Sequence, residues 1–365
     1  MKNIVKNLKK VIVHHVVFQD VEEQVLSQLA TPCSDQIILI TGPTGAGKST
    51  LCKSLVVQLK KWVIDNPESG FGPPVVIEAC EPERGEFDWK DFYWNALHGP
   101  LGEPGMTKKI DITESLKALR ENKTLTRYRG TSIPRLRELF IDVVNARKPI
   151  VVFIDEIQAA AKTRNSIRRG DNMDVIKTLS INTNSTFIPI GTYEARKMLY
   201  ASGQAARRVT VAHMRRYTLE EINSQYKPII EFFCDELGVP LSASVRRDVD
   251  YLYNQTIGCV GILSEWFVKS INLAIGRKKR VIDRDILEKV RLRNIQLAGI
   301  AAETIAFETE HASEGDFNLS EFFKLTAPDA KSVAFDYSND SLRQKRTART
   351  PGRRAPARDA VGNSE

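Results

Sequence analysis

A glycine-rich segment that ends in a lysine and a serine could bind the phosphates of a nucleotide. Residues 42–49 read Gly-Pro-Thr-Gly-Ala-Gly-Lys-Ser, which matches the Walker A pattern in full. Glycines let backbone N–H groups turn toward an anion, Lys48 brings a positive charge to the β- and γ-phosphates, and the Ser49 hydroxyl can ligate Mg²⁺. We therefore predict ATP and Mg²⁺ as cofactors. The predicted nucleotide contacts in this loop are Gly42, Pro43, Thr44, Gly45, Ala46, Gly47, Lys48, Ser49 and Thr50.

Two adjacent carboxylates could supply the hydrolytic half of the same site. Asp155 and Glu156 directly follow the apolar run 150–154. An apolar strand that ends this way places both carboxylates at the carboxyl edge of a parallel sheet, where α/β folds bind ligands. We expect Asp155 to hold Mg²⁺ and Glu156 to orient and deprotonate the attacking water. The acidic pair favours an ATP hydrolase over a switch GTPase or a kinase.

Alternating strands and helices must position these residues. The β-branched run 37–41 before the loop predicts a buried strand, and apolar residues spaced by three and four after it predict a helix. Further buried strands are expected at 75–79, 149–154, 186–190 and 209–213, with helices at 134–144 and 174–181. This alternation predicts an α/β fold, a parallel sheet flanked by helices on both faces. Thr192, at the end of the strand near 190, would approach the γ-phosphate.

The chain after Leu219 shows helical patterns only, and the predicted division into domains follows from this change. We expect an N-terminal segment over 1–30, an α/β nucleotide-binding domain over 31–218, a small all-helical lid domain over 219–300 and an extension over 301–340. Residues 341–365 contain seven basic and two acidic residues with few large apolar ones. They are expected to form a disordered basic tail, which either attracts DNA, RNA or an acidic partner or only aids solubility.

The composition excludes several classes of protein. The chain has 365 residues, a formal net charge of +8, 42% hydrophobic and 27% charged residues, which is ordinary for a globular protein. No apolar run approaches the ~20 residues of a membrane span, and the start shows no signal peptide, so neither a membrane protein nor secretion is expected. Five widely spaced cysteines argue against a zinc site or a disulfide framework and fit a reducing cytoplasm.

These motifs together resemble those of AAA+ ATPases and, within them, of the TniB/TnsC-type regulators of DNA transposition. The resemblance covers about Val11 to Val290 and rests on five segments: 14–18 (His-His-Val-Val-Phe), 42–49, 154–158 (Ile-Asp-Glu-Ile-Gln), 190–192 (Ile-Gly-Thr) and 258–261 (Gly-Cys-Val-Gly). It implies an AAA+ P-loop core with nucleotide bound between neighbouring subunits. It also implies a ring or helical oligomer on double-stranded DNA, which marks a target site and recruits or activates a transposase together with a target-selection protein.

The resemblance also assigns roles to individual residues. Thr192 corresponds to sensor 1, and Phe18, in the segment 14–18, would line the adenine pocket. Arg207 or Arg208 would act as the arginine finger toward the neighbour's γ-phosphate, with the pair 215–216 as a weaker alternative. Where many AAA+ proteins carry a sensor-2 arginine, this chain has Gly261. That departure predicts a switch-like ATPase whose hydrolysis is either slow or dependent on a partner.

A basic stretch between the second strand and the acidic strand could follow a DNA backbone. Residues 117–137 contain seven lysines and arginines against a single acid, Glu121. Such charges act on phosphates, so binding should tolerate any sequence and weaken steeply with salt. The predicted DNA contacts are Lys123, Arg127, Arg129 and Thr131.

Two other functions remain open. A clamp or helicase loader of the replication-initiator type would share the ATPase core, but would normally add a C-terminal winged helix, and residues from 301 onward show little pattern for one. A nucleotide-dependent signalling or scaffold ATPase would never touch DNA. Nucleotide-dependent DNA binding distinguishes these classes.

Overall fold

The computed structural model describes residues 4–5, 8, 11–30, 36–81, 86–102, 132–162, 166–183, 185–200 and 209–315. The chain divides into two compact units, Met1–Thr309 and Glu310–Glu365. Every contact discussed below lies within the first unit. The predicted basic tail, residues 341–365, lies outside the described residues.

The described residues include a five-stranded parallel sheet in the order β2-β3-β4-β1-β5. The strands are β1 Ile37–Thr41, β2 Val75–Glu78, β3 Val151–Asp155, β4 Thr186–Gly191 and β5 Val209–His213. All five residues of β1 are buried, as expected for a central strand with helices on both faces. The predicted α/β fold with a parallel sheet is confirmed, and each predicted strand is present within two residues of its expected ends.

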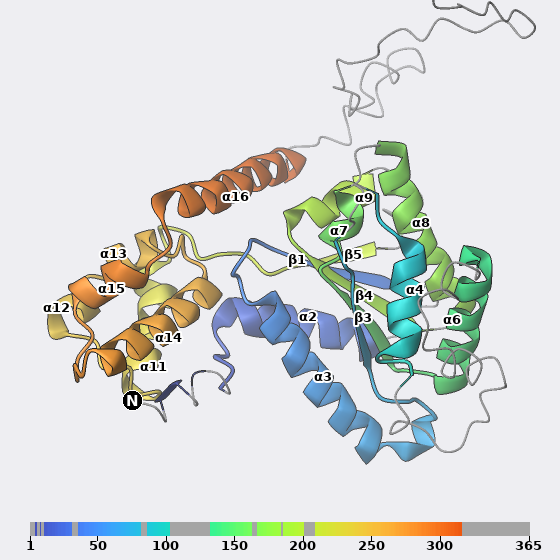
Figure 1. Cartoon of the computed structure of the whole chain (residues 1–365), viewed down its shortest axis with the longest axis horizontal. Coiled ribbons are helices and arrows are strands. Elements are labelled where there is room, and N and C mark those ends of the chain that lie inside the picture. Colours follow the sequence, from blue (N-terminus) through green and yellow to red (C-terminus); the bar gives the residue numbers. More distant parts are fainter. Residues whose placement is uncertain are drawn as a thin grey trace, which may run out of the picture. The chain divides into compact units, whose positions relative to one another are not determined.

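Side chains alternate between the two faces of the sheet and pack into two cores. Ile38 and Ile40 belong to the core that includes α2 (Val16–Ala30) and α3 (Lys48–Asp65). Ile37 and Leu39 belong to the core that includes α4, α6 and α8. Figure 1 shows these two helical layers on opposite sides of the strands. The second layer comprises α4 Trp89–His98, α6 Ile133–Arg147 and α8 Ser166–Thr183. The shorter helices in this half of the chain are η1 Pro67–Ser69, α7 Gln158–Ala161, η4 Tyr193–Arg196 and α9 Lys197–Tyr200.

The chain from residue 222 onward is helical wherever elements are assigned, as the apolar stripes predict. Its elements are the π-helix η5 Ile222–Tyr226, then α11 Lys227–Asp235, α12 Ala243–Arg247, α13 Val249–Asn254, α14 Val260–Gly276, α15 Arg284–Val290 and α16 Asn294–Gly315. Leu252, Leu263 and Phe267 are fully buried among them. Helix α16 runs across residue 300, the predicted end of the lid domain. None of the helices in the described part of the chain could cross a membrane.

Candidate functional site

A cavity of about 430 Å³ lies at the carboxyl ends of β3 and β4, next to the loop that joins β1 to α3. This volume falls in the usual range of small-ligand sites. The cavity gathers residues predicted separately from three motifs: Thr44, Gly45, Gly47, Lys48, Ser49, Thr50, Asp155, Glu156 and Thr192. Gly42, Pro43 and Ala46 belong to the same loop without lining the cavity.

The loop has the backbone that its glycines allow. Gly45 (φ 80°) and Gly47 (φ 110°) adopt left-handed conformations, and α3 begins directly after Gly47. The N-terminus of α3 therefore faces the cavity, which favours an anion there. Lys48 Nζ donates hydrogen bonds to the carbonyl oxygens of Gly42 and Pro43, each at 2.8 Å. Burial lowers the pKa of Lys48 to about 8, although nearby Glu156 and Asp155 oppose this shift.

A glutamine couples the acidic strand end to the strand beside it. The backbone N–H of Glu156 donates to Asp155 Oδ1 at 2.9 Å, and burial raises the pKa of the Asp155 carboxyl. The Gln158 amide donates to the Glu156 carboxylate and accepts the Thr192 N–H at 3.1 Å. Glu156 itself is exposed and has a positive φ of 58°, a conformation that is uncommon for non-glycine residues. The predicted base and the predicted sensor therefore share one hydrogen-bonding partner.

Five further polar residues line the cavity without having been predicted as site residues: Gln158, Lys162, Glu194, Glu265 and Glu303. Gln158 had a signal, because it ends the Asp-Glu-Ile-Gln string. Lys162 lies one helical turn later and pairs with Glu81. Glu303 comes from α16, a segment without a recognisable motif, so only the fold reveals it.

The helical region contacts the loop through a glycine. A Cβ at Gly261 would lie 2.5 Å from the Gly45 carbonyl oxygen, far inside the normal contact distance. On the other side of this contact, a Cβ at Gly45 would lie 2.4 Å from Ile262 Cγ1. The start of α14 therefore packs directly on the loop, and the position that carries an arginine in many AAA+ proteins has no space for a side chain.

We expect Gly261→Ala to lower nucleotide affinity by about tenfold, because overpacking this contact costs on the order of 1–3 kcal/mol or forces α14 off the loop. Isothermal titration with ATPγS measures the change. Gly276→Ala is the matched control, since the same helix ends there and a Cβ would meet nothing within 4 Å. Equal affinities for the two variants would contradict the tight contact.

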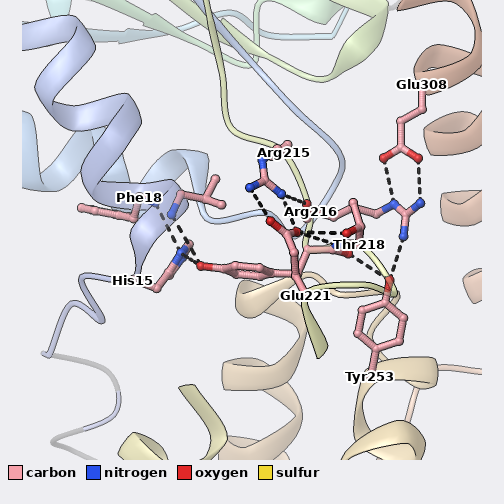
Figure 2. Close-up of polar contacts among 10 residues, drawn as sticks. His15, Phe18, Arg215, Arg216, Thr218, Glu221, Tyr253 and Glu308 are labelled. Carbon is pink, nitrogen blue, oxygen red and sulfur yellow. Dashed lines mark hydrogen bonds and ion pairs between the residues drawn. The ribbon is translucent and has the colours of Figure 1, made fainter. Parts of the chain in front are cut away.

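The N-terminal segment packs against Tyr217, four residues after the end of β5. Phe18 is 2% exposed and belongs to the core, so its role at the adenine ring stays a prediction. His15 Nδ1 lies 2.9 Å from the Tyr217 hydroxyl and 3.3 Å from the Phe18 N–H, and both partners can donate to it (Figure 2). An imidazole nitrogen that accepts in this way is unprotonated. Burial, with His14 adding to it, lowers the pKa of His15 to about 4.

We expect the stability of the protein to fall between pH 6.5 and pH 4 in part because of His15. Its folded pKa lies below the unfolded value of 6.5, so the unfolded chain binds the extra proton over this range and acid favours unfolding. His15→Gln removes this proton uptake. Between pH 6.5 and pH 4, the free energy of unfolding of the variant should therefore fall by about 2 kcal/mol less than that of the wild type. Chemical denaturation at both pH values tests this; parallel losses in the two proteins would contradict it.

Two of the arginines considered as fingers are held by carboxylates of the same chain. Arg215 makes two 2.7 Å hydrogen bonds to Glu221. Arg216 makes bonds of 2.8 and 2.7 Å to Glu308 and donates to the Tyr253 hydroxyl at 3.0 Å, as Figure 2 shows. The remaining predicted residues lie outside the described residues: Arg207, Arg208, Lys123, Arg127, Arg129 and Thr131.

A family model matches part of the chain, and several solved structures are similar to it. Residues 33–199 match a family model described as an AAA domain. No curated protein sequence matches the chain. Similar solved structures include the Aeropyrum pernix ORC2 protein in ADPNP–ADP complexes (12% identity, TM-score 0.46, 75% of this chain and 66% of that one) and the A. pernix ORC1 protein with DNA (13%, 0.48, 77% and 65%). A third is a Walker-type ATPase of Pyrococcus abyssi (14%, 0.46, 80% and 74%).

The match covers both halves of the site, the loop 42–49 and the strand end at Asp155 and Glu156. This chain spans slightly less than two thirds of the length of each of the two Aeropyrum proteins. The sheet order, the loop and the domain match together identify the fold. Residues 33–199 match the AAA-domain model, and the parallel sheet with the loop 42–49 between β1 and α3 has the fold of a P-loop core.

Proposed function

We propose that this protein binds and hydrolyses ATP with Mg²⁺ at the cavity formed by the loop and the ends of β3 and β4. The observation that carries the proposal is the convergence of Lys48, Glu156 and Thr192 on one cavity. The loop residues 42–50 and the N-terminus of α3 would hold the phosphates. Ser49 and Asp155 would hold Mg²⁺, since oxygen ligands suit this ion and both residues line the cavity. When bound, the ion supplies positive charge to the phosphate oxygens.

The side chains around the attacking water would come from β3 and β4. Glu156 follows β3, and Gln158 fixes its distance to Thr192 at the end of β4. We propose that Glu156 accepts the proton of the water while Thr192 lies near the γ-phosphate. Gly261 contributes no cation from the helical region, and the Arg215 and Arg216 side chains are paired with carboxylates. Hydrolysis by one isolated chain is therefore proposed to be slow.

We further propose that ATP binding drives assembly on duplex DNA and that the assembly regulates transposition. Arg207 or Arg208 would complete the site of a neighbouring subunit. Lys123, Arg127, Arg129 and Thr131 would contact DNA phosphates, so binding would not depend on sequence. The support is the set of motifs shared with TniB/TnsC-type regulators and the net charge of +8. The bound oligomer would mark a target, recruit a transposase and a target-selection protein, and disassemble on hydrolysis.

Filter binding of the full chain to a labelled duplex tests this function. Retention is expected with ATPγS, and not with ADP or without nucleotide, and should weaken at least a hundredfold between about 50 and 200 mM salt. Negative-stain images of the same samples should contain rings or helical filaments. A chain that binds ATPγS but ignores DNA would instead be a signalling or scaffold ATPase. Stimulation of a transposase, rather than loading of a helicase, separates the two DNA-dependent functions.

A further inference from the structure

Helix α16 places a carboxylate in the part of the cavity where we propose phosphates bind. Glu303 lines the cavity together with Lys48 and Thr192. Its Oε1 is buried and has no hydrogen-bond partner, while the nearby Thr192 lowers the pKa of the carboxyl. Burial, and secondarily Glu194, raises the pKa of Glu303, while the Lys48 ammonium opposes the shift. Glu303 is therefore a half-buried carboxylate next to Lys48 and Thr192, the two residues proposed to contact phosphate, and it would repel a phosphate bound there.

The charges around the cavity make this position unfavourable for a triphosphate. The titratable residues that line the cavity are two lysines and five carboxylates. A γ-phosphate near Lys48 and Thr192 would lie next to Glu303, and neighbouring like charges repel at the low effective dielectric of a protein site. A diphosphate ends before this point. Glu303 should therefore affect ATP more than ADP.

One face of α16 holds Glu303 in place. Residues 303 and 307, and residues 304 and 308, are each one helical turn apart. The Phe307 ring stacks on Tyr193 with centroids 3.7 Å apart and planes 8° apart, and the Arg196 guanidinium lies 4.7 Å from the Phe307 centroid. Glu308 forms the two-bond pair with Arg216 (Figure 2). Thr304 is 1% exposed. These contacts fix the helix against the residues that follow β4 and β5.

The same contacts link α16 to the N-terminal segment. Arg216 donates to the Tyr253 hydroxyl, which donates to the Tyr217 carbonyl oxygen at 2.9 Å. The Tyr217 hydroxyl in turn bonds to His15. A displacement of α16 would therefore disturb a chain of hydrogen bonds that reaches the segment predicted to border the adenine ring.

We propose that Glu303 is a specificity-determining residue. While α16 is docked, Glu303 lies beside the position of the γ-phosphate, so the site binds ADP more readily than ATP. Binding of ATP then displaces α16. This inference rests on the proposed nucleotide site. The docked helix is thus an autoinhibitory latch, opened by the triphosphate and closed again after hydrolysis. Unlike a metal-supporting carboxylate, Glu303 weakens triphosphate binding.

Competition binding on the full chain tests the latch. We measure the affinities of ATPγS and ADP, both with Mg²⁺, for the wild type, Glu303→Gln and Glu68→Gln, which removes an exposed carboxylate of η1 that does not line the cavity. Glu303→Gln should raise the ATPγS affinity about tenfold and leave the ADP affinity within about twofold, because only the triphosphate meets the removed charge. Glu68→Gln should change neither affinity. Glu308→Gln removes the charge and one acceptor of the pair with Arg216, so it should also favour ATPγS.

Hydrogen–deuterium exchange of residues 294–309 gives a second readout. ATPγS should increase exchange there in the wild type, while ADP should not. Equal gains for both nucleotides, weaker ATPγS binding by Glu303→Gln, or protection of α16 by ATPγS would overturn the latch while leaving the nucleotide site intact. If neither the wild type nor Glu303→Gln bound any nucleotide, the proposed function would fail, and the latch with it.

Discussion

Replacing Lys48 with alanine is expected to lower the affinity for ATP by about a hundredfold or more, which amounts to loss of binding at ordinary concentrations. Lys48 and Lys162 are the cations that line the described cavity, and Lys162 is exposed and paired with Glu81. Lys48 instead lies at the start of α3, partly buried beside the carboxylates of the site. Equilibrium binding of a fluorescent ATP analogue measures the loss.

Unfolding is not expected to explain the effect of Lys48→Ala. A partly buried ammonium whose pKa is lowered is poorly solvated, so its removal relieves a cost that offsets the loss of its two hydrogen bonds to Gly42 and Pro43. The melting temperature should therefore stay close to that of the wild type. Lys53→Ala, an exposed lysine on the same helix, is the matched control and should bind normally. Tight ATP binding by Lys48→Ala would place the nucleotide elsewhere.

The main parts of the site could be predicted from the sequence because they are local. A glycine loop between a buried strand and a helix, and an apolar run that ends in Asp155 and Glu156, each have a short-range pattern. Parallel strands bring their carboxyl ends to one edge, so Thr192 and Glu156 had to lie near the loop. The sequence also showed Gly261 as a departure from a motif. The steric reason for a glycine at this position, its contact with Gly45, could be seen only in the structure.

The contribution of α16 could not be predicted, because it depends on contacts between distant parts of the chain. Phe307 meets Tyr193, and Glu308 meets Arg216, at separations of about a hundred residues. The helix itself has weak periodicity, and its glutamates belong to no motif that the sequence analysis found. Phe18 was named by a family motif as a nucleotide contact; the structure adds that it is buried in the core, and its role at the adenine ring stays a prediction. A motif indicates the chemistry that a site can perform, whereas the packing of the chain determines which side chains line that site.

Replacing Glu156 with glutamine is expected to slow ATP hydrolysis by about 10²–10⁴-fold while ATP binding is retained. Glutamine keeps the length of the side chain and can still bond to Gln158, so the link to Thr192 survives. It cannot accept the proton of the attacking water. If hydrolysis triggers disassembly, as proposed, the variant should remain on DNA with ATP for far longer than the wild type.

Dissociation from a labelled duplex after addition of unlabelled competitor measures this lifetime. Glu78→Gln is the matched control, since Glu78 ends the neighbouring strand β2 in register with Asp155, is exposed and does not line the cavity. Its hydrolysis and release should equal those of the wild type. A Glu156→Gln complex that hydrolyses slowly yet dissociates at the wild-type rate would separate the two events, because release would then follow a step other than the loss of the γ-phosphate.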